Sequence, residues 1–232
     1  MNNSQIPQHI GLFPDGNRRW ARAKGLHTLL GHEKGREHFE EFLDWCKEKG
    51  IKVVTVYGFS TENWNRSKEE VDYLMDIFEK GLSNRSSIEK FQKDGVKVRI
   101  IGQKYRLRPS LQKVIAHIEE VTKNNTAFVM NLAVSYGGRW DVLQAVQKII
   151  QKKIPAEQVT EEIMEENLET AGLPEPDLII RPGGQQRLSN LLLWQAAYSE
   201  LYFSEKNWPD FSKQDFEAAL AEYANRQRRF GH

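Results

Sequence analysis

Residues 9–20 of the chain read HIGLFPDGNRRW. The run from His9 to Phe13 is short and apolar, which is typical of a buried strand. A carboxylate, a glycine, an amide and two guanidiniums follow at once, in the turn after the predicted strand. In an open α/β sheet, ligands bind at this end of the strands. An acid beside two arginines suits a metal-bound diphosphate, because the acid can ligate the cation while the arginines donate to phosphate oxygens.

Apolar runs alternate with amphipathic segments along the rest of the chain. Strands are predicted at 10–13, 52–57, 96–101, 127–133 and 177–180, with a short one near 201–203. Helices are predicted at 32–49, 68–93, 109–123, 140–153, 161–171 and 213–229. This alternation indicates an α/β fold with a central, mostly parallel six-stranded sheet flanked by helices. No repeat, low-complexity tract or shift in composition marks a boundary, so residues 1–232 are predicted to form a single domain.

The predicted helix 68–93 carries a stripe of apolar side chains at helical spacing. Its members are Val71, Leu74, Met75, Ile77, Phe78 and Leu82. Such a stripe is ordinarily part of a core, but it can equally form the wall of an elongated apolar cavity. Periodicity alone does not separate the two interpretations.

A second polar segment, STENWNR at residues 60–66, follows the predicted strand that ends near Phe59. It should therefore face the same crevice as the first, and Arg66 offers another planar fork of donors. The structural alternative makes Ser60 or Asn63 the cap of the helix that follows. A cap does not account for the arginine and the tryptophan together.

A third segment, RPGGQQRLSN at residues 181–190, follows the predicted strand 177–180. Two glycines between two arginines predict an oxyanion cradle, with Ser189 as a hydroxyl donor. The alternative is a surface loop with solvated arginines. Together the three segments predict a site for two phosphorylated ligands.

Two single residues carry predictions of their own. Glu200 stands among apolar and aromatic residues, where burying an unpaired carboxylate is costly, so a metal or an arginine partner is expected. His32 follows Gly31 at the start of a predicted helix, and it is either a helix-start or core histidine or a proton donor or diphosphate contact.

Composition limits the classes of function. The net charge of +1 gives no general attraction to nucleic acid, so a nucleic-acid partner is not expected and phosphate binding must come from local arginines. Cys46 is the only cysteine, which excludes an intrachain disulfide and a cysteine-based zinc site and fits a reducing cytoplasm. The longest apolar runs are too short to cross a bilayer, and the polar N-terminus lacks a signal-peptide pattern. A cytoplasmic protein is expected, with contact to a membrane surface left open.

These motifs, in this order, resemble the cis-prenyltransferase family, whose best-known member is undecaprenyl diphosphate synthase. The matching segments run from about residue 9 to residue 231 and include DGNRRWA, GH, YGFSTENWNR, NLAVSYGGRWD, RLSN, LLLWQ, ELYF, WPDF and RRFG. The resemblance implies a homodimeric α/β enzyme with an apolar tunnel between sheet and helices. It implies condensation of an allylic prenyl diphosphate with isopentenyl diphosphate, with Mg²⁺ bound, to give a Z-polyprenyl diphosphate. The lipid product implies possible peripheral membrane contact.

The resemblance also assigns roles, position by position. The implied catalytic residues are Asp15, Asn17, His32, Ser60 and Asn63. The implied substrate-binding residues are Gly16, Arg18, Arg19, Trp20, Trp64, Arg66, Arg181, Arg187 and Ser189. The implied metal ligands are Asp15 and Glu200, the latter supplied by the dimer partner.

Four positions depart from the family pattern. Arg18 replaces a common glycine, and Thr28 stands where bacterial members usually have an arginine, so Arg18 is a candidate substitute for a diphosphate contact. Pro182 replaces a usual threonine and Gln185 a usual glutamate, both in the acceptor loop. An irregular prenyltransferase, acting on a second allylic diphosphate or an alcohol, therefore stays open as an alternative. A non-catalytic partner subunit is disfavoured, because such relatives lose the aspartate loop that is intact here.

Overall fold

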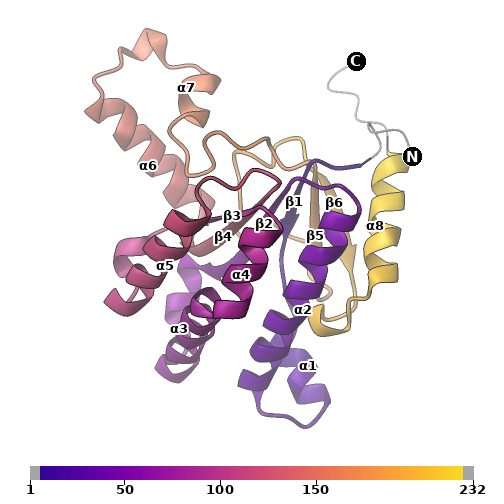
Figure 1. Ribbon diagram of the computed structural model, residues 1–232. Coiled ribbons are helices and arrows are strands. Elements are labelled where there is room, and N and C mark those ends of the chain that lie inside the picture. The colour runs from indigo at the N-terminus through magenta and orange to yellow at the C-terminus, as the bar shows by residue number, and fades with distance from the viewer. Residues whose placement is uncertain (1–5, 227–232) are drawn as a thin grey trace.

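The computed structural model describes residues 6–226. All its strands lie in one parallel, six-stranded sheet of order β3-β4-β2-β1-β5-β6 (Figure 1). The strands are β1 (His9–Leu12), β2 (Val53–Ser60), β3 (Val96–Ile101), β4 (Phe128–Tyr136), β5 (Leu178–Pro182) and β6 (Glu200–Ser204). The predicted α/β class and six-stranded sheet are confirmed.

Helices connect each strand to the next until β5. They are α1 (Asn17–Ala23), α2 (Thr28–Glu48), α3 (Lys68–Ser83), α4 (Arg85–Lys93), α5 (Pro109–Thr122), α6 (Gly138–Gln151), α7 (Glu161–Glu165) and α8 (Lys213–Asn225). Short 3₁₀ turns include η2 (Thr61–Asn65) and η5 (Trp208–Asp210). No helix within residues 6–226 is both long and apolar enough to span a membrane.

The predicted helix 68–93 is wrong as a single element, because it breaks at Asn84. The backbone of Asn84 is extended, with φ −65° and ψ 118°, and its side chain accepts a hydrogen bond from the Ser87 amide. An asparagine that accepts in this way caps a new helix rather than continuing the old one. The stripe of predicted apolar residues therefore belongs to α3, and α4 forms a separate wall.

Two other helices also differ from prediction. The helix predicted at 161–171 ends at Glu165, because the chain beyond it turns toward α6, where the Glu169 amide donates to Asp141. Residues 17–20, predicted as part of the turn after the first strand, instead begin the helix α1. The last residues predicted for α8 lie outside the described residues.

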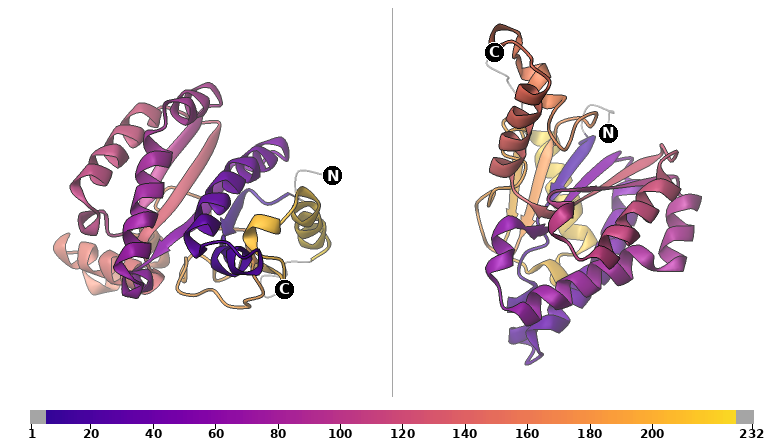
Figure 2. Two further views of the ribbon diagram at one scale, coloured as in Figure 1. Left: turned by 90° about the horizontal axis from the view of Figure 1, so that it is seen from below. Right: turned by 90° about the vertical axis from the view of Figure 1, so that its left-hand side faces the viewer.

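The sheet separates two apolar layers. The helices α2, α3, α5 and α8 cover one face (Figures 1 and 2). Their side chains pack against alternate strand residues such as Ile10, Leu12 and Val56. On the other face, a smaller cluster joins Phe13 and Ile179 to the segment that contains Leu191 and Leu192. The helices α6 and α7 project from the rest of the molecule.

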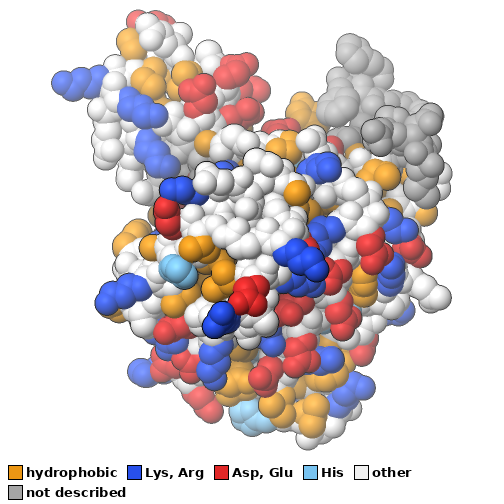
Figure 3. Space-filling view, viewed as in Figure 1, with side chains coloured by type: hydrophobic (Ala, Val, Ile, Leu, Met, Phe, Trp, Pro, Cys, Tyr) orange, Lys and Arg blue, Asp and Glu red, His pale blue; other side chains and the backbone are white. Residues whose placement is uncertain are grey.

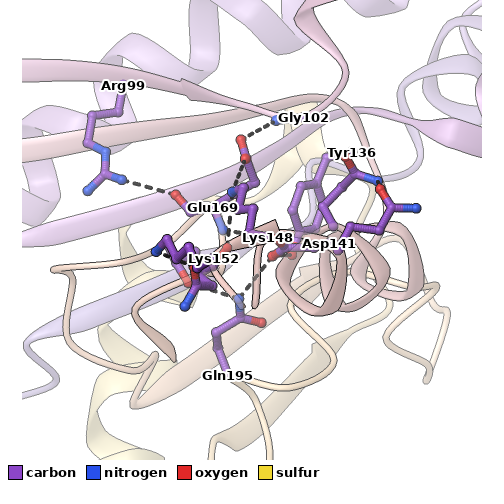
Figure 4. Close-up of polar contacts among 12 residues, drawn as sticks. Arg99, Gly102, Tyr136, Asp141, Lys148, Lys152, Glu169 and Gln195 are labelled. Atoms are coloured by element: carbon purple, nitrogen blue, oxygen red, sulfur yellow. Dashed lines mark hydrogen bonds and ion pairs between the residues drawn. The ribbon is translucent and has the colours of Figure 1, made fainter. Parts of the chain in front are cut away.

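A buried polar network fixes the base of α6 to the chain on either side of β5 (Figure 4). The carboxylate of Asp141 accepts from the Tyr136 hydroxyl at 2.8 Å, from the Gln195 amide at 3.2 Å and from the Glu169 backbone amide at 2.9 Å. Burial raises the pKa of Asp141, but these three donors oppose that effect by stabilising the carboxylate. The network holds the segment that leads from β5 to β6 against the sheet.

His9 is buried on β1, an inner strand of the sheet that lies between β2 and β5. Its ring nitrogens contact the Pro174 carbonyl at 2.7 Å and the Thr55 hydroxyl at 2.8 Å. Burial lowers the pKa of His9 from 6.5 to about 4, because the imidazolium would lose its hydration, although the Pro174 carbonyl and Asp177 favour the charged form.

This shift predicts that His9 makes the protein acid-sensitive. Between pH 6.5 and 4 the unfolded chain binds a proton that the folded chain excludes, so the free energy of unfolding falls as the pH falls, by about 3 kcal/mol from this group. In His9→Gln, the decline over that range should be shallower in urea unfolding measured at several pH values. His117→Gln, on the exposed side of α5, serves as the matched control. An unchanged slope in His9→Gln would contradict the role of this histidine.

Candidate functional site

A crevice of about 520 Å³ lies at the carboxyl ends of the strands. Its polar lining comes from the loop after β1 with the start of α1, from α2, from the end of β2 with the segment that follows, and from β5 with the loop after it. The residues involved include Asp15, Asn17, His32, Ser60, Asn63, Arg66, Arg181 and Ser189. The three polar segments therefore converge on one crevice, as expected for the carboxyl edge of a parallel sheet.

The carboxylate of Asp15 is held by basic side chains from α1 and β5. Its Oδ2 accepts from Nη2 of Arg181 at 2.9 Å, and its Oδ1 accepts from Nη2 of Arg19 at 3.4 Å. The Gly16 amide also donates to Oδ1, at 2.6 Å. Because the Asp15 side chain keeps 34% of its surface exposed, this acid still faces solvent and ligand.

Arg181 is the buried arginine of the site. Besides Asp15, its guanidinium donates to the Ser189 hydroxyl at 2.8 Å and to the Arg187 carbonyl, and it lies over the ring of Phe13 at 4.6 Å. These contacts fold the loop after β5 around one side chain. The Arg187 side chain itself is exposed and does not line the crevice.

The prediction that the Gly183 and Gly184 amides form an oxyanion cradle is wrong, because both amides already donate to backbone carbonyls. The amide of Gly183 donates to the Lys206 carbonyl at 2.7 Å, and that of Gly184 donates to the Ser204 carbonyl at 2.8 Å. The glycines serve a close approach instead. A Cβ on Gly183, where φ is +98°, would lie 2.9 Å from Nη2 of Arg19, so only glycine lets the loop after β5 pack against the loop after β1.

Ser60 and Asn63 line the crevice and also form a cap. They make a reciprocal capping box on η2, in which the Ser60 amide donates to Oδ1 of Asn63 at 3.0 Å. The long helix α3 has its own cap, Ser67. Ser60 and Asn63 therefore both cap a short helix and line the crevice, so the two interpretations of this segment do not exclude each other.

Two predicted tryptophans point away from the crevice. The Trp64 indole donates to the Ser135 hydroxyl at 2.8 Å and packs against Phe59. The Trp20 indole donates to Asp210 on η5 at 2.8 Å. Neither lines the crevice, so their predicted contact with substrate stays a prediction that this arrangement does not support.

Glu200 lies at the opposite end of the sheet from Asp15. It begins β6 beside Leu178, which pairs with Ile10 on β1, five positions before Asp15. A metal or an arginine is expected as the partner of Glu200. The structure supplies an arginine, since Arg226 donates to the Glu200 carboxylate at 2.6 Å. Within one chain, Asp15 and Glu200 do not share a site, and no group of three acids, histidines or cysteines among residues 6–226 forms a metal cluster.

An apolar cavity of about 140 Å³ opens from the polar crevice. Pro14, Asn17, His32, Gly58 and Leu74 line both spaces. From the stripe on α3, Leu74, Ile77, Phe78 and Leu82 line the cavity, whereas Val71 and Met75 pack in the core. The stripe is thus partly core and partly cavity wall.

Glu70 is the residue that the sequence interpretation missed. It is buried in the first turn of α3, and its carboxylate contacts Arg66 at 2.9 Å, His32 at 3.2 Å and Arg18 at 3.2 Å. Burial lowers the pKa of His32, with the hydrogen bond to Glu70 opposing it, so the ring is neutral near pH 7. The signal available in the sequence was the spacing of four between Arg66 and Glu70, with Glu70 next to the apolar stripe of α3.

Two buried atoms beside the crevice have no hydrogen-bond partner among residues 6–226. They are Oδ1 of Asn17 and Nε of Arg181, two of the three such side-chain atoms found there. Since buried polar atoms are normally satisfied, an unpaired acceptor and donor at one crevice indicate a place for a polar ligand.

Comparison with known proteins gives the family. Residues 13–231 match the family model described as "Putative undecaprenyl diphosphate synthase". The chain belongs to this family. A Thermoplasma volcanium protein named tritrans,polycis-undecaprenyl-diphosphate synthase (geranylgeranyl-diphosphate specific) is 46% identical over 97% of this chain and 89% of its own. A Pasteurella multocida protein named ditrans,polycis-undecaprenyl-diphosphate synthase ((2E,6E)-farnesyl-diphosphate specific) is 41% identical over 100% of this chain and 97% of its own.

A solved structure of the same fold comes from a plant. Lavandulyl diphosphate synthase from Lavandula x intermedia, in complex with dimethylallyl diphosphate, superposes with a TM-score of 0.94 at 36% identity, over 99% of this chain and 100% of that one. The undecaprenyl diphosphate synthase family thus accounts for the predicted resemblance and for the fold.

The contacts of Arg181 predict that a change to lysine destabilises this family member. Lysine lacks the planar fork, so Arg181→Lys should lose hydrogen bonds to Ser189 and to the Arg187 carbonyl, at about 2 kcal/mol of unfolding free energy in urea. Arg187→Lys is the matched control, because its side chain is exposed and its change should stay within about 0.5 kcal/mol. Equal effects of the two substitutions would contradict the central role of Arg181.

Proposed function

We propose that this protein is a cis-prenyltransferase that condenses an allylic prenyl diphosphate with isopentenyl diphosphate to give a Z-polyprenyl diphosphate. The observation that carries the proposal is the junction of a basic polar crevice with an apolar cavity, with His32, Asn17 and Gly58 lining both. An allylic diphosphate has the same two parts, a charged head and a hydrocarbon tail. A mixed distribution of acidic and basic side chains on the face seen in Figure 3 offers no one-signed surface that would suit nucleic acid.

In this proposal the arginines stabilise the leaving group. The allylic C–O bond breaks, negative charge collects on the departing diphosphate, and Arg19, Arg66 and Arg181 are placed to donate to it. The double bond of isopentenyl diphosphate forms the new C–C bond and leaves a carbocation. The carbon next to this cation then loses a proton to a diphosphate oxygen or a nearby polar group, which forms the new double bond. The apolar lining keeps water from the cationic carbon.

A magnesium ion fits the residues as a companion of the substrate. Mg²⁺ is commonly held by one or two carboxylates together with substrate phosphates and waters, and Asp15 offers one partly exposed carboxylate at the crevice. When bound, the ion would supply charge neutralisation for the diphosphate. If Glu200 serves as the second ligand, as predicted, it does so from a neighbouring copy of the chain.

An irregular prenyltransferase, joining the allylic group to a second allylic diphosphate or an alcohol, is the second candidate. Gln185 and Pro182 alter the predicted acceptor loop. The apolar cavity of 140 Å³ is close to the volume known to hold one benzene molecule, about one isoprene unit. A non-catalytic subunit is disfavoured, because the chain retains Asp15, Asn17, Arg19 and Arg66.

Product analysis by mass spectrometry tests the proposed function. We expect Mg²⁺, isopentenyl diphosphate and an allylic primer of C5, C10, C15 or C20 to give products that grow by C5 units. In Asp15→Ala we expect a rate at least about 10³-fold lower in a chain whose circular dichroism is unchanged. Product from an allylic diphosphate alone would favour the second candidate. If no pair of substrates gives any transfer, both candidates are overturned. A near-normal rate in Asp15→Ala would refute the role of Asp15.

We also propose a homodimer formed through α6. Leu143, Val146 and Ile150 lie three and four positions apart on this projecting helix, and their side chains are 61%, 39% and 68% exposed. A face of this kind is typical of an interface with another protein. Cytoplasmic location and membrane contact through the lipid product stay predictions.

Light scattering coupled to size exclusion tests the dimer. We expect the mass of two chains for the wild type and of one chain for the double variant Leu143→Glu/Ile150→Glu, because two carboxylates cannot be buried unpaired at an interface. Leu30→Glu, at an exposed leucine of α2, is the matched control and should stay dimeric. A monomeric wild type, or a dimeric double variant, would contradict the interface.

A further inference from the structure

Glu70 gathers basic groups from three separate parts of the fold. Arg18 comes from α1, His32 from α2, and Arg66 follows η2, and all three contact the Glu70 carboxylate within 3.2 Å. The Glu70 side chain is only 10% exposed, compared with 42% for Arg18 and 30% for Arg66. A buried carboxylate therefore occupies the inner side of two arginines whose outer sides remain open.

This cluster lies where the two cavities meet. His32 lines both the polar crevice and the apolar cavity, and Arg66 lines the crevice. Since the apolar cavity begins here, the head of an allylic diphosphate whose tail enters the cavity must stop beside these groups. The arginines that Glu70 holds are then among those nearest to the head group.

Packing alone does not account for a carboxylate at this position. Glu70 is flanked on α3 by the buried Val71 and Leu74, and burying an ion pair is often no more stabilising than a well-packed apolar residue. A carboxylate also differs from an apolar residue in one functional respect: it is an anion that competes with phosphate oxygens for the same donors.

We propose that Glu70 is a positioning residue that occupies Arg18 and Arg66 as a resident anion in the empty protein and gives them up to the allylic diphosphate when it binds. The inference rests on the proposed function and adds a mechanism of entry and release. In the empty state the carboxylate ties α1, α2 and the start of α3 together. On binding, each arginine exchanges one carboxylate oxygen for a phosphate oxygen, and no bond other than these hydrogen bonds changes. On release of diphosphate, Glu70 takes the donors back, which favours departure of this product.

Calorimetric titration with inorganic pyrophosphate tests the exchange without turnover. If Glu70 competes for the arginines, Glu70→Gln should bind pyrophosphate about tenfold more tightly than the wild type, equivalent to about 1.4 kcal/mol. Glu69→Gln is the matched control, because it removes one charge from the same turn at an exposed position, and its affinity should be unchanged. If Glu70 merely orients the arginines, Glu70→Gln should bind more weakly, and weaker or equal binding overturns the proposal.

Steady-state kinetics and a second variant complete the test. In Glu70→Gln we expect a lower KM for the allylic diphosphate together with a lower kcat, because product diphosphate leaves more slowly; a raised KM overturns the proposal. Glu70→Asp keeps the charge on a shorter side chain, so its pyrophosphate affinity should lie between those of the wild type and Glu70→Gln, and it carries the test if Glu70→Gln does not fold. A wild type that does not bind pyrophosphate overturns the proposed function and this inference together, whereas wild-type binding with the wrong order among variants overturns the inference alone.

Discussion

The ion pair between Asp15 and Arg181 is the contact on which the arrangement of the site depends. It joins residues 166 positions apart, at the ends of the neighbouring strands β1 and β5. Because Arg181 also binds the Arg187 carbonyl and the Ser189 hydroxyl, one buried guanidinium sets the shape of the whole loop after β5. The catalytic candidate and the acceptor candidate are thereby fixed relative to each other before any ligand arrives.

The order of the strands explains why polar loops from distant parts of the sequence meet. β1 lies between β2 and β5, so the loops after these three strands leave the sheet side by side at one edge. The helices α2 and α3 then cover one face of the sheet, and the gap between them and the strands becomes the apolar cavity. A polar head site and an apolar tail site are therefore consequences of the same strand order, one at the edge of the sheet and the other on its face.

Much of this could be predicted from the sequence, for a physical reason. Buried parallel strands are short apolar runs, and ligand residues follow them directly, so the sheet and the three polar segments can be located from local pattern. The occupied amides of Gly183 and Gly184 could not, because their acceptors, the carbonyls of Lys206 and Ser204, are brought near only by folding. The break at Asn84 depends on a local cap, the bond from the Ser87 amide, which the helical spacing of the apolar residues before it masks. Glu70 was missed because two of its three partners, Arg18 and His32, come from segments that are distant in the sequence.

Charge balance in the empty crevice leads to one further conclusion about specificity. Two arginines line it, Arg66 and Arg181, and two more lie beside it through shared acids. Arg19 and Arg181 share Asp15, and Arg18 and Arg66 share Glu70. With Glu62, which also lines the crevice, three carboxylates stand against these four guanidiniums, which leaves one positive charge in excess. A ligand that carries a single weak acceptor gains little by displacing these pairs, whereas a diphosphate brings several negative oxygens that can satisfy two arginines at once. From this pairing of acids and arginines we expect the site to favour diphosphate over singly charged or neutral prenyl compounds, before the length of the hydrocarbon tail is considered.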